Sequence, residues 1–299
     1  MGVWTRIPRG FRDKVERVAP ESFWVWLHQL REVEVDRRWT TGRLLRDAHP
    51  DLVAPEPQHE AMRRAEARVY SQNGEDGILA WLLGLVGITN RTLVEFGIGD
   101  GSECNSANLL LTFGWSGALL EADPEKAEAA YRFFDGRARV EVRNRALEPD
   151  NVNEALTELV PEVIDLLSLD IDGNDYWVWQ ALTAVRPRVV AIEYNSTFGP
   201  ERSVTVPYKR GFDRYREHAS GFYHGASLRA LAKLGAEKGY LLAGCDSRGA
   251  NAFFVDTGAA AGKLDEQLPA AAFYELHERS HLQLEKQLDQ IRHLPLVDV

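Results

Sequence analysis

The chain has 299 residues, of which 44% are hydrophobic and 27% charged, so it can bury a substantial core and is not a disordered chain. Its formal net charge of -10 repels nucleic-acid phosphates, so we predict no nucleic-acid partner. No apolar run approaches the roughly 18 residues that span a bilayer, and the first residues lack the apolar stretch of a signal peptide. With only two cysteines, in unrelated contexts, these features predict a cytoplasmic protein that does not bind a membrane.

Three regions follow one another along the chain. Residues 1–68 are rich in charge and tryptophan, and the apolar spacing around Trp24 and Trp26 predicts a helical N-terminal extension. Residues 69–258 form the predicted main domain. Residues 259–299 carry an apolar stripe that predicts a C-terminal helix. This helix or the N-terminal extension could pack on the main domain or join a second copy of the chain.

From residue 70 onward, short apolar runs alternate with helical patterns, which is typical of βαβ units and a mostly parallel sheet. We predict strands at 92–97, 117–121, 139–143, 165–170, 188–193, 239–244 and 251–256. We predict helices at 73–86, 105–113, 124–134, 151–160, 174–184 and 225–237. Because only residues 246–250 separate the last two strands, these should pair antiparallel. The expected fold is therefore α/β and Rossmann-like, with seven strands and an antiparallel last strand.

A segment with little regular pattern, residues 196–225, follows the fifth predicted strand. Connections of this length inside a compact domain are typically lids or binding loops, although a solvated surface loop is the alternative.

A glycine-rich turn, "EFGIGDG" at 95–101, follows the first predicted strand. Gly97, Gly99 and Gly101 allow a sharp turn and a close approach of a ligand to the backbone. The dinucleotide fingerprint needs a glycine or alanine where this chain has Ser102, which weakens a nicotinamide or flavin hypothesis.

The next predicted strand ends in an acid, Glu121, placed where a carboxylate can accept both ribose hydroxyls of a nucleoside. The two features together predict an S-adenosylmethionine site, with Glu95 facing the methionine end of the cofactor. The alternative is a structural turn next to a solvated acid.

Four stretches of the chain resemble the FkbM-like family of S-adenosylmethionine-dependent methyltransferases, which has the class I methyltransferase fold. They are "YSQNGEDGIL" (70–79), "VEFGIGDGSECNSANLLLTFGWSGALLEADP" (94–124), "DLLSLDIDGNDYWVWQAL" (165–182) and "RPRVVAIEYN" (186–195). Gln72, Asn105 and Ala122 lie within these stretches and complete the predicted cofactor site. The chain departs from the common family pattern at Asp172 and Asp175, where glutamates are frequent.

Acidic residues follow the fourth and fifth predicted strands. Asp170, Glu193 and Asn195 offer oxygen atoms at adjacent strand ends, which suits Mg²⁺ or a similar divalent cation. Metal-dependent sugar O-methyltransferases of macrolide biosynthesis, which this region resembles, use such a set. The alternative is that Asp170 and Asp172 cap the following helix and orient the substrate.

Two parts of the sequence contain histidines that could be functional, and we retain only one of them as a candidate. His224 precedes a predicted helix and is our candidate for the base that takes the acceptor proton, although a structural role is the alternative. "HERSH" at 277–281 matches a zinc-protease motif, but it lies in the apolar stripe of the C-terminal region and lacks a third ligand downstream. We expect no zinc site there.

These patterns predict a methyltransferase that moves a methyl group from S-adenosylmethionine to an oxygen of a small-molecule acceptor, such as a sugar or natural product. Asp170, Asp172 and His224 are its candidate catalytic residues. One alternative takes "DID" at 170–172 as the metal-chelating motif of a nucleotide-sugar glycosyltransferase. Another is a non-catalytic cofactor-binding scaffold protein.

Overall fold

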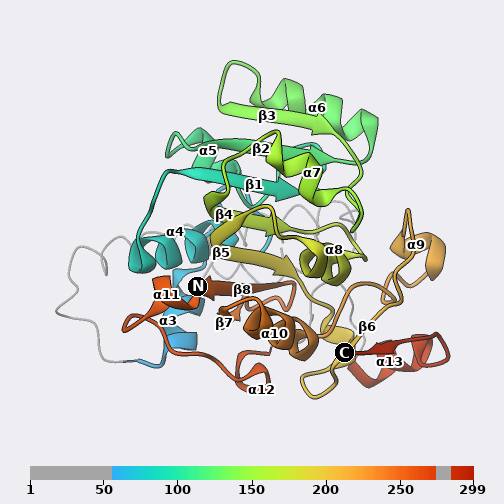
Figure 1. Cartoon of the computed structure of the whole chain (residues 1–299). Coiled ribbons are helices and arrows are strands. Elements are labelled where there is room, and N and C mark those ends of the chain that lie inside the picture. Colours follow the sequence, from blue (N-terminus) through green and yellow to red (C-terminus); the bar gives the residue numbers. More distant parts are fainter. Residues whose placement is uncertain (1–55, 274–283) are drawn as a thin grey trace, which may run out of the picture. The chain divides into compact units, whose positions relative to one another are not determined.

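A computed structural model describes residues 56–273 and 284–299 (Figure 1). Its central sheet has the strand order β3-β2-β1-β4-β5-β8-β7. These strands are β1 (Thr92–Phe96), β2 (Ser116–Glu121), β3 (Arg139–Asn144), β4 (Val163–Leu169), β5 (Arg186–Glu193), β7 (Tyr240–Cys245) and β8 (Asn251–Asp256). Only β8 runs antiparallel to its neighbours, β5 and β7. This topology confirms the predicted Rossmann-like fold of class I methyltransferases and the antiparallel pairing of the last two strands.

Helices follow most of the strands in sequence and cover both faces of the sheet. The longer ones are α3 (Gln58–Ala65), α4 (Glu75–Val86), α6 (Pro124–Phe134), α10 (Leu228–Glu237) and α13 (Leu284–Ile291). The shorter ones are α5 (Ala107–Leu111), α7 (Val152–Thr157), α8 (Asp175–Ala181), α9 (Arg214–Glu217), α11 (Thr257–Ala260) and α12 (Pro269–Ala272). Among the described residues no helix is long and apolar enough to cross a membrane.

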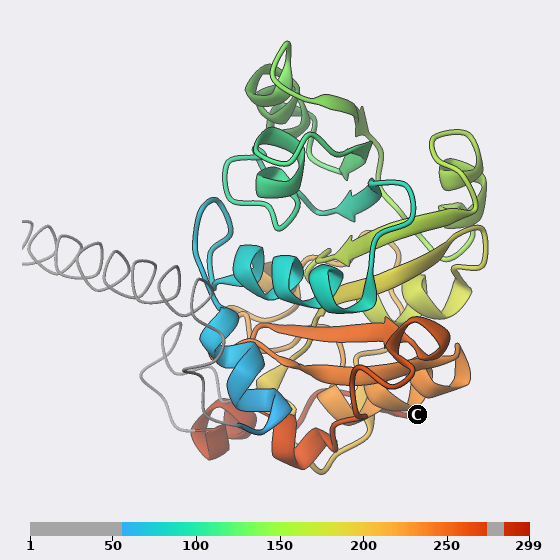
Figure 2. The same cartoon turned by 90° about the vertical axis from the view of Figure 1, so that its left-hand side faces the viewer.

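The period of two along the strands divides the core into two layers. Val94 and Phe96 of β1 pack in the layer formed with α7, α8 and α10, whereas Leu93 packs in the layer formed with α3, α4, α5, α6 and α11. In Figure 2, α3 and α4 (blue and cyan) lie on one side of the sheet and α8 and α10 (yellow-green and orange) on the other. Both faces of the sheet centre are therefore buried, which explains why a central strand such as β4 is mostly apolar, whereas the edge strand β3 is polar and partly exposed.

A helix N-cap determines the length of the turn that follows β2. Asp123 accepts hydrogen bonds from the backbone N–H groups of Glu125 and Lys126 at the start of α6, and Pro124 occupies the first helical position. Helix α6 therefore begins three residues after Glu121, so this acid lies in a short, defined turn at the sheet edge.

The long segment 196–225 contains short elements that pack against the end of the chain. It includes the 3-10 helix η3 (Ser196–Phe198), β6 (Val204–Thr205) and α9. Strand β6 pairs antiparallel with β9 (Val297–Asp298), and Tyr223 donates a hydrogen bond to the Pro295 carbonyl at 2.6 Å. A third apolar cluster, with Phe198 and Ile291 among its buried members, joins the two segments. The structure thus holds the predicted binding loop against the C-terminal segment.

Parts of the predicted N-terminal extension and C-terminal helix lie outside the described residues. Of the stretch 1–68, only residues from 56 onward are described. They include α3, which packs against α4 and β7 and buries Met62. Trp24, Trp26 and the "HERSH" stretch are not among the described residues. Of the stretch 259–299, the structure describes residues 259–273 and 284–299, which include α12, α13 and β9.

Candidate functional site

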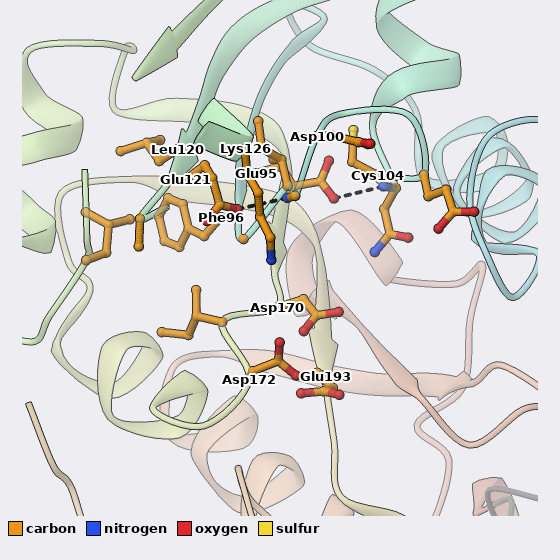
Figure 3. Close-up of a pocket in the computed structure, with 18 of the residues that line it drawn as sticks. Glu95, Phe96, Asp100, Cys104, Leu120, Glu121, Lys126, Asp170, Asp172 and Glu193 are labelled. Atoms are coloured by element: carbon orange, nitrogen blue, oxygen red, sulfur yellow. Dashed lines mark hydrogen bonds between the residues drawn. The ribbon is translucent and has the colours of Figure 1, made fainter. Parts of the chain in front are cut away.

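The carboxyl ends of β1, β2, β4 and β5 open onto one cavity of about 650 Å³. Nine carboxylate side chains line it, against two basic ones, Lys126 and Arg145. Figure 3 shows two groups of side chains, with Glu95 and Glu121 near the first two strands and Asp170, Asp172 and Glu193 apart from them. All seven residues predicted to bind the cofactor line this cavity, namely Gln72, Glu95, Gly97, Gly99, Asn105, Glu121 and Ala122.

The three glycines of the turn have different reasons for lacking a side chain. All three have positive φ angles. A Cβ atom on Gly97 would lie 1.6 Å from the Asp170 carbonyl oxygen, and one on Gly101 would lie 2.7 Å from the Phe134 ring. A Cβ on Gly99 would meet nothing within 4 Å. Close packing within the protein therefore requires Gly97 and Gly101, and only Gly99 leaves open space for a ligand.

Glu95 holds the end of the glycine-rich loop. Its carboxylate accepts hydrogen bonds from the backbone N–H groups of Asn105 and Ser106, both at 2.8 Å, and from the Ser168 hydroxyl at 3.2 Å. Burial raises the pKa of the Glu95 carboxyl, and these hydrogen bonds oppose that rise. The Glu95 side chain is only 3% exposed. Its hydrogen bonds to Asn105, Ser106 and Ser168 hold the loop in place, whether or not the carboxylate also contacts a cofactor.

Glu121 joins the two turns of the predicted cofactor site. Its Oε2 accepts from the Gly99 N–H at 2.8 Å, and its Oε1 accepts from the Asp123 N–H at 2.9 Å. An ionised carboxylate has about four acceptor positions. Two therefore remain for other donors, such as the paired hydroxyls of a ribose.

The other predicted cofactor residues surround this turn. The Gln72 amide donates to Glu103 at 2.7 Å, which connects the segment before α4 to the glycine-rich loop. The Asn105 amide donates to the Ser168 hydroxyl at 3.1 Å. Ala122 follows Glu121 directly and lines the cavity.

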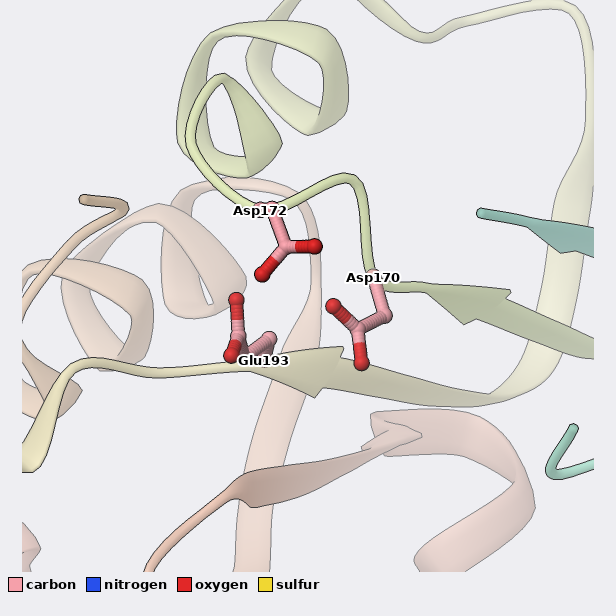
Figure 4. Close-up of side chains that lie close together, drawn as sticks. All are labelled: Asp170, Asp172 and Glu193. Carbon is pink, nitrogen blue, oxygen red and sulfur yellow. The ribbon is translucent and has the colours of Figure 1, made fainter. Parts of the chain in front are cut away.

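Three carboxylates converge at the other end of the cavity. One oxygen from each of Asp170, Asp172 and Glu193 lies within 4.8 Å of the others, and Figure 4 shows the three groups turned toward one another. Oxygen donors of this kind suit a hard divalent cation. We refer to these three residues as the acidic cluster.

Asn195, a predicted metal ligand, is not part of the acidic cluster. Its amide donates to the carbonyls of Phe222 and His224 and accepts from the Thr197 N–H at 2.9 Å. The prediction assumed that the alternation of β5 continues to residue 195, but the strand ends at Glu193 and a 3-10 helix follows. The third carboxylate that lies with Asp170 and Glu193 is Asp172.

His224 lies behind the acidic cluster and does not line the main cavity. Its Nε2 is 2.9 Å from Nη2 of Arg214, and its Nδ1 is 3.3 Å from Oε2 of Glu193. Because a guanidinium can only donate, Nε2 must be the acceptor, so the ring proton is on Nδ1 and faces Glu193. His224 therefore lies beside Glu193, and its role as the base that takes the acceptor proton stays a prediction.

Arg214 is a site residue that sequence patterns did not single out. Its Nη1 donates to Asp172 at 2.6 Å and to Glu193 at 3.2 Å, and its Nε donates to the Gly221 carbonyl at 3.0 Å. Burial lowers the pKa of this guanidinium, but the two carboxylates outweigh burial and raise it overall. The only sequence signal was its place in the long loop.

Asp175, rather than Asp170 or Asp172, fixes the turn before α8. Its carboxylate accepts from the N–H groups of Ile171 and Gly173, each at 2.9 Å. Burial, followed by the charge of Glu193, raises the pKa of Asp175 to about 7. Asp170 and Asp172 line the cavity, so Asp175 takes the role at the start of α8 that the capping alternative gave to them.

Glu148 ties the long loop to the cavity wall. Its carboxylate accepts from the Gly211 N–H at 2.9 Å and from the Tyr208 hydroxyl at 3.2 Å. It is 6% exposed and lines the cavity, but no motif marked it in the sequence.

No family model and no curated protein matches the chain. Among solved structures, an O-methyltransferase from Bacillus cereus in complex with SAH is 20% identical, with 71% of this chain and 95% of that chain covered and a TM-score of 0.39. The N-terminal domain of EvdMO1, in the presence of SAH and D-fucose, is 16% identical, with 75% and 96% covered and a TM-score of 0.41. A putative sarcosine dimethylglycine methyltransferase from Galdieria sulphuraria is 19% identical, with 56% and 61% covered and a TM-score of 0.38. Scores and identities this low do not establish a shared activity.

Proposed function

We propose that the chain is an S-adenosylmethionine-dependent methyltransferase that methylates a hydroxyl group of a small molecule, such as a sugar or a natural product. The observation that carries the proposal is one cavity with two unlike ends. The open turn at Gly99 and the acceptor positions of Glu121 lie at one end, and the acidic cluster lies at the other. Strands β2 and β4 flank β1, so their ends are roughly 10 Å apart, a distance suited to a nucleoside cofactor and a neighbouring acceptor.

The charge of the cavity supports S-adenosylmethionine over a nucleotide sugar. Carboxylates outnumber basic side chains by nine to two among its lining residues. Such a field favours a ligand with a sulfonium and an ammonium group and disfavours a diphosphate. The glycosyltransferase alternative requires that bound metal ions reverse this field, and a single divalent cation at the acidic cluster would leave the field negative.

The acidic cluster supports a hydroxylated acceptor. Carboxylates accept hydrogen bonds from hydroxyl groups, and Glu193, which contacts both Arg214 and His224, is the best-positioned proton acceptor. The donor set of Asp170, Asp172 and Glu193 also fits Mg²⁺ or a similar cation, which would lower the pKa of an acceptor hydroxyl when bound. The proposal therefore includes a divalent cation at this end.

Calorimetry with S-adenosylhomocysteine tests the cofactor half. Replacing Glu121 by Ala removes the acceptors for two ribose hydroxyls, so we expect binding to weaken roughly 10- to 100-fold. Glu125→Ala, a change at a side chain exposed on α6, is the matched control and should bind like the unchanged protein. Absence of binding by the unchanged protein at millimolar ligand would overturn the proposal.

Methyl transfer from labelled S-adenosylmethionine to a panel of hydroxylated and aminated small molecules tests the acceptor half. We expect NMR of the products to place the label on oxygen. Label found only on nitrogen would replace the hydroxyl acceptor by an amine and leave the cofactor assignment intact.

A further inference from the structure

A buried guanidinium already occupies part of the acidic cluster. Arg214 is 8% exposed, and its Nη1 donates to Asp172 and Glu193 together. The cluster therefore contains a permanent positive charge that belongs to the protein. Any further cation must bind to carboxylates that this side chain partly covers.

Charge and hydrogen bonding nevertheless leave room for a further cation. Three carboxylates and one guanidinium carry two formal negative charges, which a divalent cation would balance. Asn251 lines the same cavity opposite Glu193 in the register of β5 and β8. Its amide N donates to Glu75 at 2.7 Å, which fixes the amide orientation, and its Oδ1 has no hydrogen-bond partner among the described residues. Asn251 is 3% exposed, and a buried acceptor of this kind favours a bound cation or donor nearby.

We propose that Arg214 is the resident counter-cation of the acidic cluster, and that a divalent cation binds Asp170, Asp172 and Glu193 by competing with it. The inference rests on the cation site of the proposed function. Two positive groups that share Asp172 and Glu193 repel each other and divide the same oxygen atoms. Entry of the metal ion therefore weakens the contacts of Arg214, and removal of Arg214 strengthens the binding of the metal ion.

The competition also involves the long loop. Arg214 connects the ends of two strands to this loop through the Gly221 carbonyl and His224. Weakening its contacts with Asp172 and Glu193 removes one of the links between the loop and the sheet edge, while the hydrogen bonds of Glu148 and Asn195 to the loop remain. The coupling free energy is the same in both directions. A bound metal ion should therefore favour opening of residues 211–224 by the same free energy by which opening of that segment favours binding of the metal ion.

Titration of the full-length protein with Mn²⁺ alone, followed by electron paramagnetic resonance of the free ion, tests the competition. We expect Arg214→Gln to bind Mn²⁺ about 10-fold more tightly than the unchanged protein. Arg216→Gln is the matched control, since this arginine is exposed and contacts only Asp213 among the described ion pairs; it should bind normally. Asp170→Asn should reduce binding in either background.

Several results would overturn the proposal. Equal or weaker Mn²⁺ binding by Arg214→Gln would mean that Arg214 orients the ligands instead of competing with the metal ion. Absence of Mn²⁺ binding by both proteins would remove the site. If thermal unfolding shows that Arg214→Gln does not fold, Arg214→Lys keeps the charge with fewer donors and should show a smaller gain in affinity.

Hydrogen exchange gives an independent readout. Saturating Mn²⁺ should speed amide exchange over residues 211–224 in the unchanged protein and have little further effect in Arg214→Gln. Unchanged exchange on metal binding would contradict the link to the loop. Because S-adenosylhomocysteine binding is measured separately, failure of this competition is distinguishable from failure of the proposed function.

Discussion

The two ends of the cavity hold their carboxylates in different ways. At the β1–β2 end, Glu95 and Glu121 accept hydrogen bonds mainly from backbone N–H groups of the neighbouring turns. At the β4–β5 end, Glu193 and Asp172 are held by the side chain of Arg214, which comes from a loop about 20 to 40 residues further along the chain.

This difference separates a part fixed by the fold from a part set by individual side chains. Backbone donors remain when side chains change, so the first end can keep its shape across many sequences. The second end depends on a few charged side chains, so single substitutions can alter its charge and its ligand. We infer that cofactor binding is the more robust property and acceptor choice the more changeable one.

The largest expected effect tests whether backbone packing determines the first end. Gly97→Ala places a Cβ atom 1.6 Å from the Asp170 carbonyl oxygen and keeps a positive φ, so we expect a loss of about 4 kcal/mol in unfolding free energy. Gly99→Ala has the same backbone cost but open space, so about 1 kcal/mol is expected. Urea unfolding measures both; similar losses would contradict the distinction between the two glycines.

An intermediate effect concerns the acid that supports Asn251. Burial, followed by the charge of Glu75, raises the pKa of Asp246 to about 8 from 3.8. The folded state then binds the proton more tightly, so this stabilisation is present below pH 4 and is lost as the pH rises through 8. Relative to Asp246→Asn, we expect the unchanged protein to lose roughly 3 to 4 kcal/mol of stability between pH 5 and pH 8.

Urea unfolding of both proteins at the two pH values measures this difference. A difference between Asp246→Asn and the unchanged protein that does not depend on pH would show that Asp246 is ionised throughout.

The smallest effect concerns the attachment of the long loop to the C-terminal segment. Tyr223→Phe removes the hydrogen bond to the Pro295 carbonyl, so we expect a loss of about 1 kcal/mol and faster hydrogen exchange in residues 284–299. Tyr131→Phe, at a side chain exposed on α6, should change neither quantity. We expect the affinity for S-adenosylhomocysteine to stay unchanged, because Tyr223 lies in the long loop and not at the β1–β2 end of the cavity. A change in that affinity would contradict the separation of the two ends of the cavity.

The sequence predicted the order of strands and helices because their signals are local. The period of two, the glycine turn and the acid that ends β2 each depend on residues near one another in the chain. The position of the turn at Gly97–Gly101 was predicted correctly. The close packing against Asp170 and Phe134 that requires glycine at positions 97 and 101 is visible only in the folded chain.

The side-chain partners of the acidic cluster were not predictable in the same way. Asn195 was assigned to it by extending the alternation of β5, and the chain turns away after Glu193. Arg214 and His224 reach the cluster through an irregular loop, whose path no periodic pattern describes. The sequence also allowed Asp170 and Asp172 to be caps of the following helix. Only the hydrogen bonds in the folded chain show that Asp175 fixes this turn.

Asp172 adopts a left-handed backbone conformation, with a φ of 58°. Apart from glycine, asparagine and aspartate tolerate this conformation best, so exchange of Asp172 for Asn or Gly leaves the path of the chain intact. Position 172 can therefore change from charged to neutral without rebuilding the turn. Natural drift or directed evolution can therefore alter the charge of the acidic cluster at this position at low structural cost.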